Sequence, residues 1–263
     1  AFSADGTKMF VTGRTNDKVF QYALSTAFDV STSSYTQDFS VSSQASQPVG
    51  IAFNNDGTKM FVVDFNDDDV NEYALTTGFD ISTASYTQNF SVASQETVPH
   101  DIAFNNDGTK MFICGNGGVE VNEYALTTGF DISTASFTTN FSVSAQGSNP
   151  RGLAFNVDGT KMFVCGTTGQ DVNEYALTTG FDISTASYTQ NFSVSAQDTA
   201  PKSITFNTDG TKMFILGDAG DDINEYTLSL SKVVLGSGSF ASADVGKTIE
   251  ANGGAFVLTS TAG

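Results

Sequence analysis

Three residues that can bind anions or transfer protons follow prolines at equal spacing along the chain. His100, Arg151 and Lys202 each come directly after a proline, at steps of 51 residues, and Val49 holds the same place in an earlier copy. Two cations beside an imidazole could hold an anionic group, such as the carboxylate of an acidic sugar. The alternative is a set of solvated loop residues whose charges balance Asp101 and its neighbours. The candidate binding residues are therefore Val49, His100, Asp101, Arg151 and Lys202.

Catalysis has little support in the sequence. The chain has a single histidine, which excludes a histidine-rich metal centre. His100 beside Asp101 could act as a base with an orienting carboxylate, but adjacent residues on a strand point to opposite faces. No stretch resembles a nucleophile elbow or a phosphate-binding loop. We therefore predict no catalytic residue and no enzymatic activity. A hydrolase or lyase stays a distant third alternative, after the two binding functions given at the end of this section.

Acidic loops offer a weak candidate for a calcium site. Carboxylate oxygens that could bind Ca²⁺ come from Asp67, Asp68, Asp69, Asp221 and Asp222. No EF-hand spacing is present, and the third copy has only Glu120 at this place. A solvated acidic loop is the favoured interpretation, so the sequence predicts no metal and no cofactor.

The overall charge narrows the range of partners. With 11 Lys and Arg against 29 Asp and Glu, the formal net charge is −18. A chain of this charge repels phosphate backbones and anionic headgroups, which argues against binding to nucleic acid or to a bare membrane surface. No apolar run approaches the roughly 20 residues needed to span a bilayer.

A repeat of 51 residues organises the chain. An Asp-Gly pair begins at Asp5 and returns at every step of 51, and a phenylalanine and a tyrosine keep the same register. The copies start near residues 1, 51, 102, 153 and 204. Insertions are absent across the first four joins, as expected where each unit packs on the next in a fixed way.

The second copy predicts four strands separated by turns. They cover residues 51–54, 58–63, 70–75 and 86–92. Residues 55–57 (NDG) form a tight turn in which Gly57 takes positive φ without steric cost. Residues 58–63 (TKMFVV) are apolar on both faces, as a strand between two sheets requires. The last strand alternates, which marks a half-exposed outer position.

Four antiparallel strands repeated without helical periodicity are typical of a propeller blade. We predict an all-β chain whose residues 1–235 form a β-propeller of five four-stranded blades. The fifth copy breaks after Leu228, and residues 232–235 (KVVL) arrive early. The last blade is then completed by this shortened strand or left incomplete. Residues 236–263 form a short C-terminal β connector or tail.

Two sets of loops differ between copies and are expected on one face of the disc. The loops between second and third strands are residues 14–18, 65–69, 116–120, 167–171 and 218–222. The loops between fourth and first strands are residues 45–50, 96–101, 147–152 and 198–203. In an antiparallel blade these two connections emerge at the same end. The residues after the prolines should then surround the mouth of the central channel, where propeller ligands commonly bind.

The two cysteines occupy equivalent positions in neighbouring copies. Cys114 and Cys165 are 51 residues apart, and Thr12, Val63 and Leu216 hold the same place elsewhere. Because these replacements are small or apolar, buried free thiols are favoured over a disulfide or a metal pair.

The repeat motif resembles known propeller families. Residues 56–62 (DGTKMFV), with a V-x-x-Y-x-L pattern ending at Leu75, resemble YVTN and NHL-like propeller repeats over about the first 230 residues. Residues 177–197 (LTTGFDISTASYTQNFSVSAQ) are similar to a repeat of marine bacterial and phage proteins. The chain departs from that type at Phe181, where Trp is frequent, and at Gly180, where Pro is frequent.

The C-terminal segment resembles phage structural proteins. Residues 240–260 (FASADVGKTIEANGGAFVLTS) are similar to a short β segment of tail and virion proteins. The resemblance implies a non-enzymatic phage virion component, a tail fibre or surface appendage that displays the propeller for host-surface recognition. Its partners would be other virion proteins at the tail and a host glycan or protein at the variable loops. The alternative is a secreted or cell-surface bacterial propeller that binds glycan or protein.

Overall fold

Short antiparallel strands make up most of the chain, in a computed structural model that describes residues 1–228, 248–251 and 254–257. We call its five main sheets blades 1 to 5 in chain order. Blade 1 contains β1 (Lys8–Gly13), β2 (Lys18–Leu24) and β3 (Ser33–Ser40). Blade 2 contains β4 (Pro48–Phe53), β5 (Lys59–Asp64), β6 (Asp69–Leu75) and β7 (Ala84–Ser91). Blade 3 contains β8 (Pro99–Phe104), β9 (Lys110–Gly115), β10 (Glu120–Leu126) and β11 (Ala135–Ser142). Blade 4 contains β12 (Pro150–Phe155), β13 (Lys161–Gly166), β14 (Asp171–Leu177) and β15 (Ala186–Ser193), and blade 5 contains β16 (Pro201–Phe206), β17 (Lys212–Gly217) and β18 (Ile223–Thr227).

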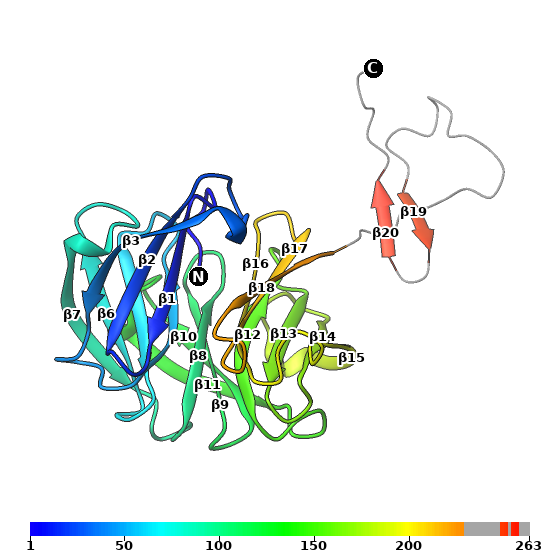
Figure 1. Cartoon of the computed structure of the whole chain (residues 1–263). Coiled ribbons are helices and arrows are strands. Elements are labelled where there is room, and N and C mark those ends of the chain that lie inside the picture. Colours follow the sequence, from blue (N-terminus) through cyan, green and yellow to red (C-terminus); the bar gives the residue numbers. More distant parts are fainter. Residues whose placement is uncertain (229–247, 252–253, 258–263) are drawn as a thin grey trace. The chain divides into compact units, whose positions relative to one another are not determined.

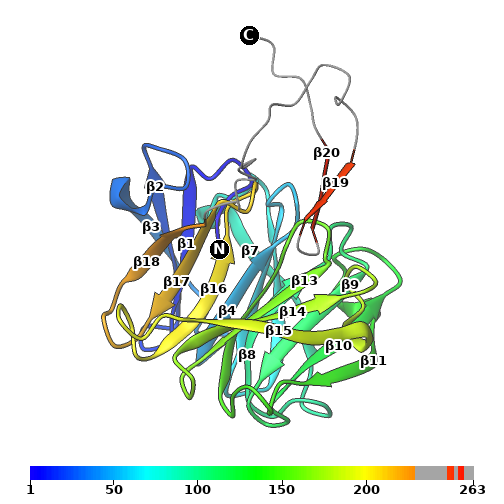
Figure 2. The same ribbon diagram turned by 90° about the vertical axis from the view of Figure 1, so that its right-hand side faces the viewer.

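The predicted all-β propeller of five blades is confirmed, as Figures 1 and 2 show. Blades 2, 3 and 4 have the expected four antiparallel strands in chain order. In blade 1 the innermost place is held by a single bridge between Phe2 and Met9, equivalent to the Phe53–Met60 pair of blade 2. In blade 5 the described residues supply three strands. The expected completing strand at residues 232–235 lies outside the described residues.

The Asp-Gly turn joins the two inner strands of a blade as predicted. Gly57 has φ of +71°, in the left-handed region that glycine adopts without strain. The Asp56 carboxylate accepts hydrogen bonds from the backbone N–H of Thr58 at 3.0 Å and from its hydroxyl. The same bonds recur in the other blades, so local chemistry fixes the hairpin each time.

The connector between the third and fourth strands contains structure that the sequence did not predict. Each connector of blades 1 to 4 carries a 3-10 helix: η1 (Val30–Thr32), η2 (Ile81–Thr83), η3 (Ile132–Thr134) and η4 (Ile183–Thr185). Asp80 caps η2 by accepting a hydrogen bond from the N–H of Ser82. The helix places Ile81 in the core, where its side chain is fully buried. The connector was expected to be a plain loop, but its 3-10 helix fills part of the core with one apolar side chain, which we call the plug.

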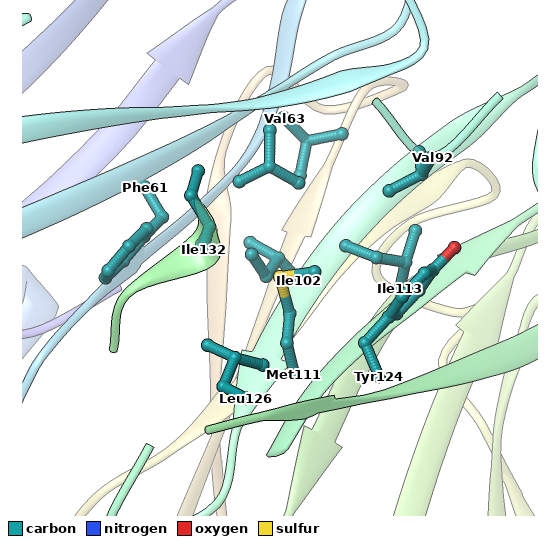
Figure 3. Packing of buried hydrophobic residues seen from close by; sticks show 10 residues of the cluster. Phe61, Val63, Val92, Ile102, Met111, Ile113, Tyr124, Leu126 and Ile132 are labelled. Atoms are coloured by element: carbon teal, nitrogen blue, oxygen red, sulfur yellow. The ribbon is translucent and has the colours of Figure 1, made fainter. Parts of the chain in front are cut away.

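The apolar core lies between neighbouring blades. Alternate residues of β5 point to opposite sides: Phe61 and Val63 pack with blade 3, and Met60 and Val62 pack with blade 1. Figure 3 shows the cluster between blades 2 and 3, to which η3 contributes Ile132. The prediction that the second strand is buried on both faces is confirmed, because each sheet is covered by a sheet on either side.

The ring closes between blade 5 and blade 1 by the same contacts that join the other blades. The Lys212 ammonium donates to the carbonyl of Phe28 at 2.8 Å, as Lys59 does to Phe130 at 2.6 Å. The ring of Phe2 packs on that of Phe214 with centroids 4.7 Å apart. Figure 2 shows β17 and β18 beside the blue strands of blade 1. Repetition of one interface thus generates a closed ring.

The chain separates into two units, Ala1–Leu228 and Ser229–Gly263. In the second unit β19 (Thr248–Ala251) pairs with β20 (Gly254–Val257) as an antiparallel hairpin, which agrees with the β character predicted for the tail. Among the described residues, none of the helices is long and apolar enough to cross a membrane.

Candidate functional site

The two sets of variable loops meet on one face of the ring. The Asp64 carboxylate, where the loop after β5 begins, accepts hydrogen bonds from the N–H groups of Ser46 and Gln47 at 3.1 and 3.0 Å. Glu96 reaches from the other loop of blade 3 to the N–H of Gly117 at 2.6 Å. The innermost strands β4, β8, β12 and β16 contact one another in order around the axis. The candidate residues after the prolines therefore lie at one end of the axis, beside the variable loops.

Side chains from four blades form one cluster at this end. Arg151 of β12 places Nη1 against both ring nitrogens of His100 on β8, 3.1 Å from Nδ1 and closer to Nε2. The His100 ring stacks on Phe65 with centroids 5.3 Å apart, and the Arg14 guanidinium lies 4.3 Å from the centroid of Phe65. We call Arg14, Phe65, His100 and Arg151 the mouth cluster.

Sequence reasoning identified two members of the mouth cluster and missed the other two. His100 and Arg151 were candidates, and they do meet. Arg14 and Phe65 lie in loops that were expected to vary, but neither was selected as a site residue. The available signal was position: each is the first residue of its loop between second and third strands, 51 residues apart. Their contact with His100 requires the arrangement of the blades.

His100 is held neutral by its surroundings. Its side chain is buried, which contradicts the alternative of a solvated loop residue for this position. Burial, followed by the charges of Arg151, Lys202 and Arg14, lowers the pKa of His100 to about 3. At neutral pH the imidazole is therefore an uncharged group with a lone pair, placed between cations.

The remaining candidate residues do not join the cluster directly. Lys202 forms a salt bridge with Asp218 at 3.2 Å, at an exposed position. The carbonyl of Val49 accepts a hydrogen bond from the Thr12 hydroxyl at 2.8 Å, and its side chain packs against the apolar cluster between blades 2 and 3. Lys202 still influences His100 through its charge, as the pKa of that imidazole shows.

Asp101 points away from His100 into the packed axis. One carboxylate oxygen accepts from the N–H of Ile102 at 2.9 Å, and the other accepts from the N–H of Leu153 at 3.0 Å. Burial raises the pKa of Asp101 to about 7. The expectation that the adjacent His100 and Asp101 point to opposite faces agrees with these contacts. The two residues act in different places.

Glycine permits this close packing at the axis. Gly50 is the equivalent of Asp101 in blade 2, and a Cβ atom there would come within 2.8 Å of the Asp101 Cα. Gly152 of blade 4 is similarly close to Ser203. The inner strands can approach because these positions lack side chains, and their approach shields Asp101 from water.

The mouth cluster brings together two guanidinium groups that no carboxylate pairs with among residues 1–228. Most other cations of the described residues pair with carboxylates, such as Lys59 with Glu72 at 2.9 Å and Lys110 with Glu123 at 2.8 Å. Lys8 instead donates to the carbonyl of Phe79 at 2.8 Å. These two paired lysines also join neighbouring blades, because Lys59 donates to the carbonyl of Phe130 and Lys110 donates to that of Phe181, both at 2.6 Å. Within residues 1–228, neither Arg14 nor Arg151 forms a salt bridge, and Nε of Arg151 is buried without a hydrogen-bond partner.

The acidic loops serve the fold. Asp69 is buried and accepts hydrogen bonds from Asn71 at 2.7 Å and from Asn89 at 2.6 Å. In the part of the chain that the structure describes, no group of three or more His, Cys, Asp or Glu side chains could hold a metal ion. The weak calcium candidates Asp67, Asp68, Asp69, Asp221 and Asp222 are thus not gathered into a ligand cluster there.

Both cysteines are free and buried, as predicted. Burial raises the pKa of the Cys114 and Cys165 thiols, so both remain protonated at neutral pH. They pack as small apolar side chains in two neighbouring core clusters.

Comparison with known proteins finds similarity in fold. No family model matches the chain, and no curated protein matches it in sequence. A structure from Bacteroides uniformis with the provisional name 6-phosphogluconolactonase superposes on the chain with a TM-score of 0.54 at 10% identity. The match covers 84% of this chain and 64% of that one. A second provisional 6-phosphogluconolactonase, of Bacteroides fragilis, gives 0.51 at 16% identity, over 82% and 62%. The periplasmic gluconolactonase PpgL of Pseudomonas aeruginosa gives 0.50 at 16% identity, over 86% and 64%.

These similarities show the propeller fold. The chain spans less than two thirds of the length of each of these structures. They say nothing about the narrower resemblance to marine bacterial and phage repeats, which stays a prediction from the motifs.

The prediction of a non-enzymatic virion component is wrong on these findings, as is its alternative of a binding propeller at the cell surface. The propellers that superpose on the chain are named as lactonases, and nothing in the comparisons points to a phage component. The prediction of no enzymatic activity is corrected by the same finding. The reason lies in the fold: a propeller gathers single residues from several blades at one face, so the lack of a local catalytic motif does not argue against an enzyme.

Proposed function

We propose that the chain is a propeller hydrolase that opens the lactone of a sugar acid at the mouth cluster. The observation that carries the proposal is the neutral, buried His100 in contact with Arg151, beside Arg14, in a protein whose net charge is −18. Lactonase names among the superposing propellers support the choice of reaction. Hydrolysis of a lactone produces a carboxylate, which suits a site with two unpaired guanidinium groups.

The proposed step needs one base and a stabiliser for negative charge. On lactone binding the Arg151 N–H that faces the His100 ring turns to the lactone carbonyl oxygen, which frees the imidazole lone pair. The oxygen of a water molecule then attacks the carbonyl carbon while that ring nitrogen takes a proton from the water. Negative charge then develops on the carbonyl oxygen, where the guanidinium of Arg14 or Arg151 can stabilise it. The ring oxygen leaves the acyl carbon and takes the proton from His100, giving a hydroxy acid.

The electrostatics of the cluster change in the direction that this step requires. In the free protein burial, and after it the charges of the cations beside His100, keep its pKa low. An oxyanion forming beside Arg151 offsets those positive charges, so the pKa of His100 rises as the reaction proceeds. A base that strengthens as charge develops favours the transition state over the bound lactone.

The test is lactone hydrolysis measured by acid release, relative to the uncatalysed rate in the same buffer. Glucono-δ-lactone and its 6-phosphate are the first substrates. His100→Gln and Arg151→Gln are expected to lower kcat/KM by about 10²-fold or more. Val49→Ala, at the same ring position in blade 2, is the matched control and should keep full activity.

The pH dependence adds a second criterion. Because the pKa of His100 is about 3, kcat/KM should stay constant between pH 5 and 7 and fall only below pH 4. No rate above the uncatalysed one on either lactone, or equal rates for the wild type and both cluster variants, would refute the proposal. The predicted partners and location of the chain stay predictions.

A further inference from the structure

A buried carboxylate joins the two variable loops in blades 2, 3 and 5. In blade 2 it belongs to Asp64, which binds the N–H groups of Gln47 at 3.0 Å and Asn66 at 3.1 Å. It comes from the end of the second strand, while in the other two blades it comes from the loop before the first strand.

In blade 3 the carboxylate belongs to Glu96. It accepts from the N–H groups of Val98 at 2.8 Å, Gly117 at 2.6 Å and Gly118 at 3.4 Å. In blade 5 Asp198 binds the N–H groups of Ala200 at 2.5 Å and Gly220 at 3.0 Å.

The carboxylate comes either from the end of the second strand or from the loop before the first strand. The residue at whichever of these two positions does not supply it is small. Where Glu96 or Asp198 supplies it, the strand end carries a glycine, because a Cβ atom at Gly115 or Gly217 would collide with the carboxyl group at 2.3 or 1.9 Å. Where Asp64 supplies it, the loop residue is Ala45. The two positions are thus alternative sources of one buried anion.

Blade 4 has glycine at both positions, Gly147 and Gly166. A small pocket lies there, with Gly147, Gly166, Asn149, Thr168, Gly169 and Asp171 among the residues that line it. A Cβ atom at Gly147 would meet nothing within 4 Å. The backbone is otherwise the same, because the N–H of Gly147 bonds the carbonyl of Val143 as that of Glu96 bonds Val92.

The amides that bind the carboxylate elsewhere are retained in blade 4. Asn149, Thr168 and Gly169 are the equivalents of Val98, Gly117 and Gly118, at a step of 51 residues. Among residues 1–228, none of these three N–H groups donates a hydrogen bond. Backbone amides converging on one point form an anion-binding concavity.

We propose that this pocket of blade 4 binds the carboxylate of a small monocarboxylic acid, in the place that Glu96 and Asp198 fill in their blades. The neighbouring Asp171 does not prevent this. Its two oxygens accept from Asn173 at 3.0 Å and from Asn191 at 2.7 Å. The equivalent Asp69 of blade 2 has the same bonds and coexists with Asp64 nearby.

The proposal is independent of the hydrolase proposal, because it depends on backbone amides of blade 4 and on no member of the mouth cluster. The probes are sodium formate and sodium acetate, titrated against sodium chloride at constant ionic strength. Amide ¹H–¹⁵N spectra of the whole chain report binding at Thr168 and Gly169, and thermal unfolding reports the linked stabilisation. We expect saturable shifts at these amides and a rise in Tm of roughly 2–4 °C near saturation.

Variants at Gly147 test the site without touching the pocket's amides. Gly147→Glu copies blade 3, so it should raise Tm without added acid and abolish the response to formate and acetate. Gly147→Ala adds only a methyl group in open space and should keep the response. Unshifted amides in the wild type, or an equal response in Gly147→Glu, would overturn the proposal. Lactone hydrolysis by the same variants reports separately on the proposed function.

Discussion

Replacing Glu120 by aspartate should give blade 3 a hydrogen bond that three other blades already have. In blades 2, 4 and 5 an aspartate lies two residues before an asparagine of the third strand, buried in blades 2 and 4 and half-buried in blade 5, and accepts its side-chain N–H. These distances are 2.7, 3.0 and 2.8 Å. In blade 3 the equivalent pair is Glu120 and Asn122.

Glu120 is too long to make this bond. Its Oε2 accepts from Asn140 across the strands at 2.6 Å, as Asp69 does from Asn89 at 2.6 Å. Asn122 is fully buried, and among residues 1–228 neither its amide nitrogen nor its oxygen has a partner. A buried donor without an acceptor costs about 1–3 kcal/mol.

Glu120→Asp should therefore stabilise the chain. A regained bond from a buried amide to a carboxylate is expected to contribute about 1–2 kcal/mol after loss of one methylene contact. For a body of this size that corresponds to roughly 2–8 °C in Tm. Urea unfolding followed by circular dichroism measures the change in free energy, and the slope should stay constant.

Two further variants decide whether the gain comes from Asn122. In an Asn122→Leu background the amide is gone, so Glu120→Asp should gain nothing. The reverse change Asp69→Glu in blade 2 should destabilise by a similar amount. The reasoning is refuted if Glu120→Asp fails to stabilise, or if its gain survives in the Asn122→Leu background.

Burial and charge lead to four other predictions. Ile132→Ala, which empties the fully buried plug of η3, should cost about 2–4 kcal/mol in urea unfolding, whereas Val30→Ala at the half-buried equivalent should cost clearly less. Lys59→Met should cost about 1–3 kcal/mol by the same measurement, because the glutamate with which it pairs is left buried without a cation. Burial raises the pKa of Asp101 to about 7, so the folded chain keeps a proton that the unfolded chain loses near pH 4, and this contribution to stability falls as pH rises from 4 to 7. Thermal melts of Asp101→Asn should lack that fall. His100 has the opposite effect in the wild type. Its folded pKa is about 3, so stability is lost as pH decreases below 6.5, where the unfolded chain binds a proton that the folded chain does not. Thermal melts of His100→Gln should lack that loss.

The candidate site was only partly predictable. Equal spacing after prolines identified His100 and Arg151, because an invariant repeat places equivalent residues at equivalent points of a ring. Arg14 and Phe65 were missed because stacking depends on the reach and direction of each side chain across a blade boundary. The function was predicted wrongly for a related reason, since residues that belong to different blades leave no local motif.

The sequence by itself determined the repeat, the all-β class, the five blades, the turn at each Asp-Gly pair and the common face of the variable loops. These features follow from local chemistry: glycine at positive φ, apolar residues on both faces of the second strand, and a fixed step of 51 residues. Only the tertiary structure decided how the ring closes, that the connectors carry buried plugs, and that blade 4 has amides without a carboxylate. Such features depend on which residues face one another across the boundary between two blades or two loops. That is set by packing between the repeats rather than by any sequence pattern within one repeat.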